Sequence, residues 1–402
     1  MRRNFSKGTA LSQGDFVMSK MAADEKYGGN TLRKIVDYFS HLAVSPNHYE
    51  KIAAHDTSFA ATPYLQKLAW LKDDTETVYD PSYDDVIRVA FMSEIKRAKL
   101  ANLVQMLAGR DFETREFKES IIEQTYKSMY DGVLNVISQH NFTQFMITLR
   151  SAGFISKKLV NSVMAIDFAY TVFLILQKSK EVPVAEIKRI VQKWYVLSVL
   201  TGRYSSSPES AFATDIRLIR ERGVVAVLKD IEAAQLSDNF WNIGLVQNLE
   251  TTSTTNPVFQ VYLASQIFFK DTSLLSANVP VSELITLGGD IHHIFPKKFL
   301  IEHGVDKSKY NQEGNYAYLD RPVNESIGKR APKDYFGSAL QQCTTKQAIV
   351  GSIIDAAELY RNLSVNCIPA DVFSMGIGDY DRFLEERRQL MAAKIHKYYE
   401  AL

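Results

Sequence analysis

Apolar residues recur three and four positions apart through most of residues 1–270. Clear examples are NTLRKIVDYFSHLA at 30–43, EFKESIIEQTYKSMYDGVLNVISQ at 116–139 and VAEIKRIVQKWYVLSVL at 184–200. This spacing gathers the apolar side chains on one face of an α-helix, whereas a strand would divide them between two faces. Glycine, proline and serine clusters separate the periodic segments, as expected for helices joined by turns. We therefore predict that residues 1–270 form a helical, bundle-like region.

The pattern changes after Asp271, where proline and glycine interrupt short stretches and NYAYLD at 315–320 alternates in the manner of a strand. Helical spacing returns near residue 345. The predicted fold class is mainly α, with a strand–strand–helix unit at 271–345 and a C-terminal helical segment at 346–402. We expect about 55–65% of the residues to be helical, well above the usual fraction for globular proteins, and strands to fall within residues 280–325.

The composition is that of an ordinary globular protein, since 46% of the 402 residues are hydrophobic and 23% are charged. A net charge of +1 indicates no overall basic field for nucleic acid, although a local basic patch would be sufficient. Cys343 and Cys367 have no CxxC spacing, which argues against a disulfide framework or a cysteine zinc site. The most apolar run, 165–177, contains Asp167 and is too short to cross a bilayer. We interpret it as a buried core helix and expect a cytoplasmic protein with no membrane partner.

Candidate catalytic residues concentrate in the strand–strand–helix unit. GGDIHHIFPKKFL at 288–300 contains Asp290, His292 and His293, while Asn315 opens the second strand and Asn324 opens the helix. A neutral imidazole can accept a proton from water, since its ordinary pKa is about 6.5. A second imidazole and an amide oxygen can bind a divalent ion and leave positions for water and phosphate. Because neighbouring residues of a regular strand point to opposite faces, we expect the strand to distort near the two histidines.

The segments DIHHIFPKKFL, NYAYLDRPVN and IGKRAP together resemble the HNH, or ββα-metal, nuclease motif. More narrowly, they resemble its version in the C-terminal domain of GmrSD-type restriction endonucleases. The resemblance implies that His293 is the general base, that His292 helps to bind the metal and that Asn315 tethers the loop. Asn324 is then a metal ligand, and Asp290 is a ligand or a group that orients one. The implied catalytic set is His293, His292 and Asn315, and the implied cofactor is Mg²⁺ or Mn²⁺.

Basic residues flank this motif and are candidate contacts for DNA phosphates. Lys297 and Lys298 follow the histidine pair, while Lys329 and Arg330 are expected to project from the helix of the motif. Acidic residues are interspersed among them, so the segment is nearly balanced in charge. Ordinary solvated side chains therefore remain an alternative interpretation of Lys329 and Arg330.

Each signal has a simpler interpretation when it is taken alone. A histidine pair in a strand near the core is often structural, and asparagines are common in turns. Their order and family spacing together favour a metal-dependent HNH DNA endonuclease. The alternative is a degenerate HNH fold that serves as a non-catalytic DNA-binding or partner-binding subunit.

Other segments resemble the same family less specifically. FSKGTALSQGDFVMSKMA at 5–22 resembles the end of the family's N-terminal nucleotide-binding domain, yet the sequence contains no Asp-Gly-Gln-Gln-Arg motif and no P-loop pattern. The resemblance implies modified or foreign DNA, such as phage DNA, as the substrate and restriction as the role. Because the nucleotide-binding motif is missing, three alternatives stay open: a fragment, a split gene whose partner is a separate nucleotide-binding subunit, or a diverged member of the family.

Overall fold

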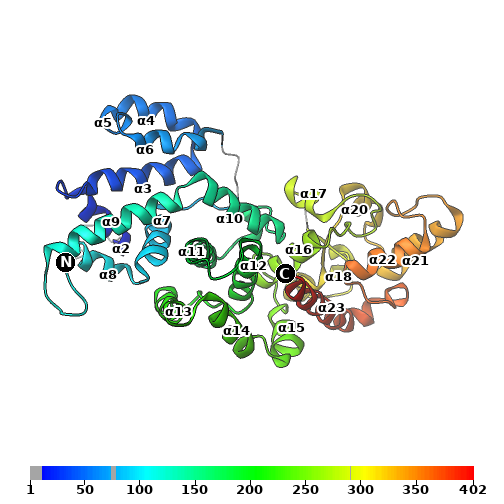
Figure 1. Ribbon diagram of the computed structural model, residues 1–402. Coiled ribbons are helices and arrows are strands. Elements are labelled where there is room, and N and C mark those ends of the chain that lie inside the picture. Colours follow the sequence, from blue (N-terminus) through cyan, green and yellow to red (C-terminus); the bar gives the residue numbers. More distant parts are fainter. Residues whose placement is uncertain (1–10, 74–77, 290) are drawn as a thin grey trace. The chain divides into compact units, whose positions relative to one another are not determined.

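The computed structural model describes residues 11–73, 78–289 and 291–402 (Figure 1). Helices take up 69% of the residues, and the described strands form one two-stranded sheet. The predicted mainly α fold class is therefore confirmed, and both strands fall within the predicted range 280–325. The helical fraction exceeds the prediction partly because the connection between the strands is itself helical, as α18 (Lys297–Glu302) and α19 (Lys307–Tyr310).

The chain divides into two compact units, Met1–Thr148 with Ser162–Asp230 and Leu149–Asn161 with Ile231–Leu402. The helices within the first unit are α2 (Gln13–Ala22), α3 (Gly29–Val44), α4 (Tyr49–His55), α5 (Thr57–Ala60), α6 (Pro63–Lys67), α7 (Tyr83–Ala90), α8 (Leu100–Met106), α9 (Glu119–Val136), α11 (Val163–Ser179), α12 (Val184–Leu200) and α13 (Pro208–Arg222), with a π-helical turn at Phe91–Ile95. Two helices, α10 (Gln139–Ser151) and α14 (Val224–Gln235), run from one unit into the other.

The second unit contains the sheet. Its elements are α15 (Leu245–Asn248), α16 (Pro257–Phe268), α17 (Val281–Thr286), β1 (Ile291–His293), α18, α19, β2 (Tyr316–Tyr318), α20 (Arg321–Ile327), α21 (Pro332–Thr345), α22 (Ala356–Val365) and α23 (Tyr380–Ala401), with a π-helical turn at Phe240–Gly244. The predicted boundaries at residues 270 and 345 both fall inside this unit.

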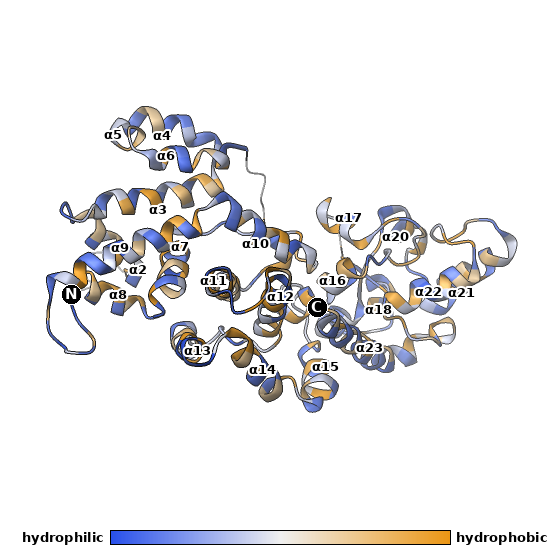
Figure 2. Ribbon diagram, in the orientation of Figure 1, coloured by the Kyte–Doolittle hydropathy of each residue, from blue (hydrophilic) through white to orange (hydrophobic). Residues whose placement is uncertain are grey.

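Helix α3 illustrates how the apolar spacing is used in the first unit. Its buried residues include Leu32, Ile35, Phe39 and Leu42, which are three or four positions apart and lie on one face. Figure 2 shows hydrophobic and hydrophilic residues interleaved along this helix. The helix ends at Val44, one residue before Ser45-Pro46, because proline disfavours a helical conformation at the residue before it.

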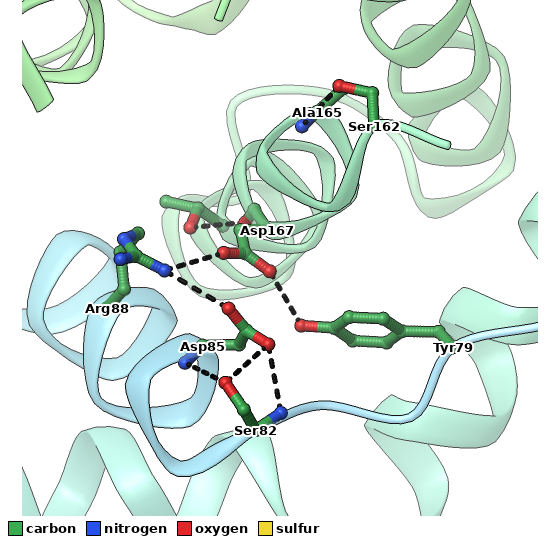
Figure 3. Close-up of polar contacts among 8 residues, drawn as sticks. Tyr79, Ser82, Asp85, Arg88, Ser162, Ala165 and Asp167 are labelled. Atoms are coloured by element: carbon green, nitrogen blue, oxygen red, sulfur yellow. Dashed lines mark hydrogen bonds and ion pairs between the residues drawn. The ribbon is translucent and has the colours of Figure 1, made fainter. Parts of the chain in front are cut away.

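Helix α11 is the predicted core helix, and every residue from Ala165 to Leu176 is buried. The fully buried carboxylate of Asp167 accepts a hydrogen bond from the Tyr79 hydroxyl at 2.8 Å and pairs with Arg88 at 3.0 Å (Figure 3). Arg88 also pairs with Asp85 of α7 at 3.1 Å. Burial raises the pKa of Asp167 well above its ordinary value, while the Arg88 charge and the Tyr79 hydrogen bond oppose this shift. These partners replace the hydrogen bonds to water that the buried carboxyl group loses. None of the described helices is both long and apolar enough to span a membrane.

The core of the second unit anchors the chain where it leaves β1. Phe295, two residues after β1, packs against Tyr380 and Phe383 with ring centroids 5.0 and 4.8 Å apart. The Tyr335 hydroxyl donates a hydrogen bond to the carbonyl of Ile294 at 2.7 Å. These contacts join the segment that follows the histidine pair to α21 and to α23, the dark red helix of Figure 1. The position of β1 is therefore set by helices that come later in the sequence.

Candidate functional site

The short sheet carries the histidine pair at its end. β1 pairs antiparallel with β2, so that His292 lies opposite Ala317 and His293 lies opposite Tyr316. This pairing is regular through His293, so the predicted distortion does not fall on the histidines themselves. The strand instead ends at His293, and the chain bends at the next two residues.

A pocket of about 240 Å³ lies at this end of β1. Its lining combines both histidines with the two lysines that follow them and with residues of α20: His292, His293, Pro296, Lys297, Lys298, Asn324, Ile327 and Gly328. Both adjacent histidines line this pocket, although β1 pairs regularly through His293. The pocket is thus lined by imidazole, ammonium and amide groups.

The surroundings of His293 favour a neutral imidazole. Burial lowers its pKa below the ordinary 6.5, the charges of Lys297 and His292 act in the same direction, and a hydrogen bond with Asn311 opposes them. Nε2 of His293 lies 3.0 Å from Oδ1 of Asn311, and the Tyr316 ring stands perpendicular to the imidazole with centroids 5.2 Å apart. The contact fits the tautomer with its proton on Nε2, which leaves Nδ1 as the proton acceptor.

Asn315 has the contacts of the predicted tether. It is fully buried, its Oδ1 accepts a hydrogen bond from the Phe295 amide at 2.7 Å, and its Nδ2 donates to the Phe295 and Tyr310 carbonyls at 3.1 and 3.3 Å. The backbone carbonyl of Asn315 also accepts from the Ile294 amide at 2.8 Å. One side chain therefore holds the exit of β1 against the entry of β2, and it acts on the site through the backbone.

Asn324 was predicted to open the helix that follows β2. It lies in α20, but as the fourth residue of that helix. The helix begins earlier because Asp320 caps it, accepting a hydrogen bond from the Val323 amide at 3.0 Å, and because Pro322 is favoured in the first turn. Asn324 and His292 also line a second, larger pocket of about 570 Å³ together with Asp320 and Glu325. His292 and Asn324 therefore share two adjoining cavities.

Two of the groups that line these pockets can bind a divalent ion. Imidazole nitrogen from His292 and amide oxygen from Asn324 are both accepted ligands, and Mg²⁺ typically keeps several waters. Asp290, the third predicted ligand, lies outside the described residues. Across residues 11–73, 78–289 and 291–402, no group of three or more His, Cys, Asp or Glu side chains could hold a metal ion. The candidate ligand set therefore depends on the amide of Asn324.

The four predicted DNA-binding residues lie in two different environments. Lys297 and Lys298 line the smaller pocket, at the start of α18. Lys329 and Arg330 do not project from α20 as predicted, because that helix ends at Ile327. Lys329 pairs with Glu302 at 3.1 Å, and Arg330 hydrogen-bonds back to the Ile327 carbonyl at 3.3 Å. Two of the four cations are thus beside the histidines, and two are held by neighbouring groups.

Asn311 was not predicted. It contacts His293 through its side chain, and its backbone carbonyl accepts a hydrogen bond from the Tyr316 hydroxyl at 2.8 Å. The sequence offered one signal, a second asparagine four residues before Asn315. Asparagine is common in loops for other reasons, so this signal alone could not separate a positioning residue from a turn residue.

Glu313, two residues before Asn315, makes the stability of this segment depend on pH. It is fully buried, one carboxyl oxygen accepts from the Asn256 amide at 3.2 Å, and burial raises its pKa to about 9 against this opposing bond. The folded protein therefore keeps a proton that the unfolded chain releases above its ordinary pKa of 4.5. Between these two values stability falls as pH rises, because the unfolded state binds fewer protons.

We expect Glu313→Gln to remove this pH dependence and to stabilise the protein at pH 8 by about 2–4 kcal/mol. Urea denaturation at pH 5 and pH 8 measures the effect, and Glu385→Gln at an exposed position of α23 is the matched control. A variant whose stability falls with pH as steeply as that of the wild type would contradict the assignment.

Comparisons of the chain with protein families, with curated proteins and with solved structures find no match.

Proposed function

We propose that this protein is a metal-dependent DNA endonuclease of the HNH type. The observation that carries the proposal is the gathering of His292, His293 and Asn324 around one pocket, where Lys297 and Lys298 also lie. A base, two ligand types and two cations at one place are the groups that phosphodiester hydrolysis needs. The proposal also rests on the resemblance of the sequence motifs to HNH nucleases.

Each residue of the site has a proposed role in the reaction. Nδ1 of His293 accepts a proton from a water molecule, whose oxygen attacks phosphorus while the bond to the leaving oxygen breaks. Asn311 holds the imidazole in the tautomer that leaves Nδ1 unprotonated. His292 and Asn324 would hold the Mg²⁺ or Mn²⁺ ion, which when bound offsets charge on the phosphate. Lys297 and Lys298 would contact phosphates next to the scissile bond.

The biological role belongs to the same proposal and rests on the resemblance alone. GmrSD-type enzymes act in restriction, so we propose that the substrate is modified or foreign DNA, including phage DNA, inside the cytoplasm. In this role we also propose a separate nucleotide-binding subunit as a partner.

Incubation of the purified protein with plasmid and with modified phage DNA, in Mg²⁺ or Mn²⁺, tests the proposal. We expect nicked or linear products with either metal and none in EDTA. A folded protein that never cuts DNA, but binds it in a salt-sensitive manner unaffected by EDTA, would instead support the non-catalytic DNA-binding alternative.

Asn311 gives a separate prediction for the pH profile. We expect Asn311→Ala to lower the cleavage rate about 10-fold, since the partner that orients a catalytic imidazole is lost. The rising limb of the pH–rate profile should also move to lower pH, because the hydrogen bond with Asn311 raises the pKa of His293. Asn311→Asp should move the limb to higher pH, since a carboxylate favours the imidazolium. Limbs that stay in place in both variants would show that Asn311 does not act on His293.

A further inference from the structure

Five of the eight residues that line a separate pocket in the first unit are cationic. It has a volume of about 250 Å³ and is formed by residues 96–102 and by α13. Its polar lining consists of Lys96, Arg97, Lys99, Asn102, Arg217 and Arg220. No carboxylate is part of the lining that the described residues form. We call this the basic pocket.

Local structure brings these side chains together from distant parts of the sequence. The π-helical turn Phe91–Ile95 ends at Lys96, whose φ of 60° is in the left-handed region, and the chain then reaches α8 through an irregular segment. The guanidinium of Arg97 lies over the Phe112 ring, 4.8 Å from its centroid, which restrains its position. The Lys96 ammonium donates a hydrogen bond to the Ser93 carbonyl, and Lys99 is exposed.

Helix α13 supplies the other side of the basic pocket. Ala213, Arg217 and Arg220 are four and three positions apart, so they share one face of the helix. Phe212 and Ile216 are buried in the core on a neighbouring face. The small side chain of Ala213 leaves space between the two arginines and the irregular segment.

The charge of the basic pocket is largely uncompensated. Arg217 pairs with Glu221 at 3.2 Å, but in the described part of the chain no carboxylate lies within 4.0 Å of the side-chain nitrogens of Lys96, Arg97, Lys99 or Arg220. Burial lowers the pKa of Lys96 to about 8, with Glu94 opposing and Lys178 adding to the shift. Like charges held close together repel, so a bound anion would stabilise the arrangement. The net charge of +1 hides this local concentration.

We propose that the basic pocket binds a phosphate group of the DNA backbone. Arginine and lysine match phosphate oxygens in charge and hydrogen bonding. The lining contains no aromatic ring on which a base could stack, and the volume lies below the usual range of small-molecule sites, about 300–1,000 Å³. The basic pocket therefore recognises the phosphate rather than a whole nucleotide. The identity of DNA as the source rests on the proposed function.

Fluorescence anisotropy with a labelled DNA duplex tests the inference, with the full chain in EDTA so that binding is measured without cleavage. The test variant is Lys99→Glu/Arg220→Glu, which reverses two exposed charges of the basic pocket. The control is Lys188→Glu/Arg189→Glu, which makes the same charge change at exposed positions of α12 in the same unit.

We expect the test variant to bind the duplex about 10-fold more weakly at 0.1 M salt, and the slope of log K against log salt concentration to fall by about 1–2. The control should keep the wild-type slope. Equal losses in both variants would overturn the inference, because they would reflect overall charge rather than a site.

A second measurement separates the two sources of phosphate. Titration calorimetry with inorganic phosphate and pyrophosphate should show weak binding or none. Tight binding of either anion that is lost in the test variant, together with unchanged affinity for the duplex, would make this a small-anion site and overturn the inference. This result is distinguishable from a failure of the endonuclease proposal. A protein that cuts no DNA can still bind the duplex through the basic pocket, with a salt dependence that is reduced in the test variant.

Discussion

Replacing His293 by alanine is expected to lower the rate of DNA cleavage by about 10²–10⁴-fold, the usual contribution of a positioned acid–base group. Affinity for Mn²⁺ should barely change, because His292 and Asn324 remain at the pocket. Single-turnover cleavage and calorimetric titration with Mn²⁺ give the two readouts. The matched control is His140→Ala, at an exposed position of α10, which should cleave at the wild-type rate.

His292→Ala and Asn324→Ala should behave differently from His293→Ala. Both are expected to weaken Mn²⁺ binding, and part of the lost activity should return at high Mn²⁺ concentration, since added metal restores occupancy by mass action. If His293→Ala loses the metal while His292→Ala binds it normally and is inactive, the two roles are reversed.

The pH–rate profile adds a test of the same residue. A general base acts in its neutral form, so the rate should rise with pH as His293 loses its proton. From the residue type alone, the rising limb is expected near pH 6–7. Burial and the adjacent positive charges lower the pKa of His293, which moves the limb below pH 6.5. The limb should be absent from the residual activity of His293→Ala.

The largest expected effect on stability comes from the buried cluster of the first unit. Asp167→Ala leaves Arg88 and the Tyr79 hydroxyl in the core without their shared acceptor. Removal of one partner of a buried ion pair typically costs about 3–5 kcal/mol. We expect a loss of this size in the free energy of unfolding, measured by urea denaturation and far-ultraviolet circular dichroism.

Two further variants locate the source of that loss. Asp131→Ala changes an exposed aspartate of α9 and should alter stability by less than about 0.5 kcal/mol. Arg88→Met/Asp167→Leu removes this ion pair as a whole and should recover part of the stability lost in Asp167→Ala. Asp85 loses its pairing with Arg88 in this variant but keeps its hydrogen bonds from Ser82. A double variant that is no more stable than Asp167→Ala would show that lost packing, rather than lost pairing, causes the effect.

Much of the fold could be read from local patterns. The three-and-four spacing of apolar residues predicted helices such as α3 and α12, and the buried run at α11 was recognised although it contains Asp167. These predictions succeed because helix formation and amphipathic burial depend on neighbours within one or two turns. The part of the sequence that contains the strands was also predictable, because the change from helical to strand-like spacing of apolar residues after Asp271 is a local pattern.

The candidate site could be predicted only in part. Residue type and order singled out His292, His293, Asn315 and Asn324, because few residue types can accept protons or bind divalent ions. The start of α20 was misplaced by three residues, since the capping role of Asp320 depends on where the preceding strand ends. The ends of short elements are decided by such single hydrogen bonds, which periodicity does not reveal.

The long-range contacts and the pKa shifts depend on tertiary packing. The partner of Asp167 is Arg88, which lies 79 residues away in the sequence, and the basic pocket joins residues near 96 to residues near 217. Local spacing carries no information on such pairs, because they form only when separate helices pack. The lowered pKa of His293 and the raised pKa of Glu313 have the same origin. Each depends on how much water the folded chain excludes from the group, and the sequence around a residue does not determine that exclusion.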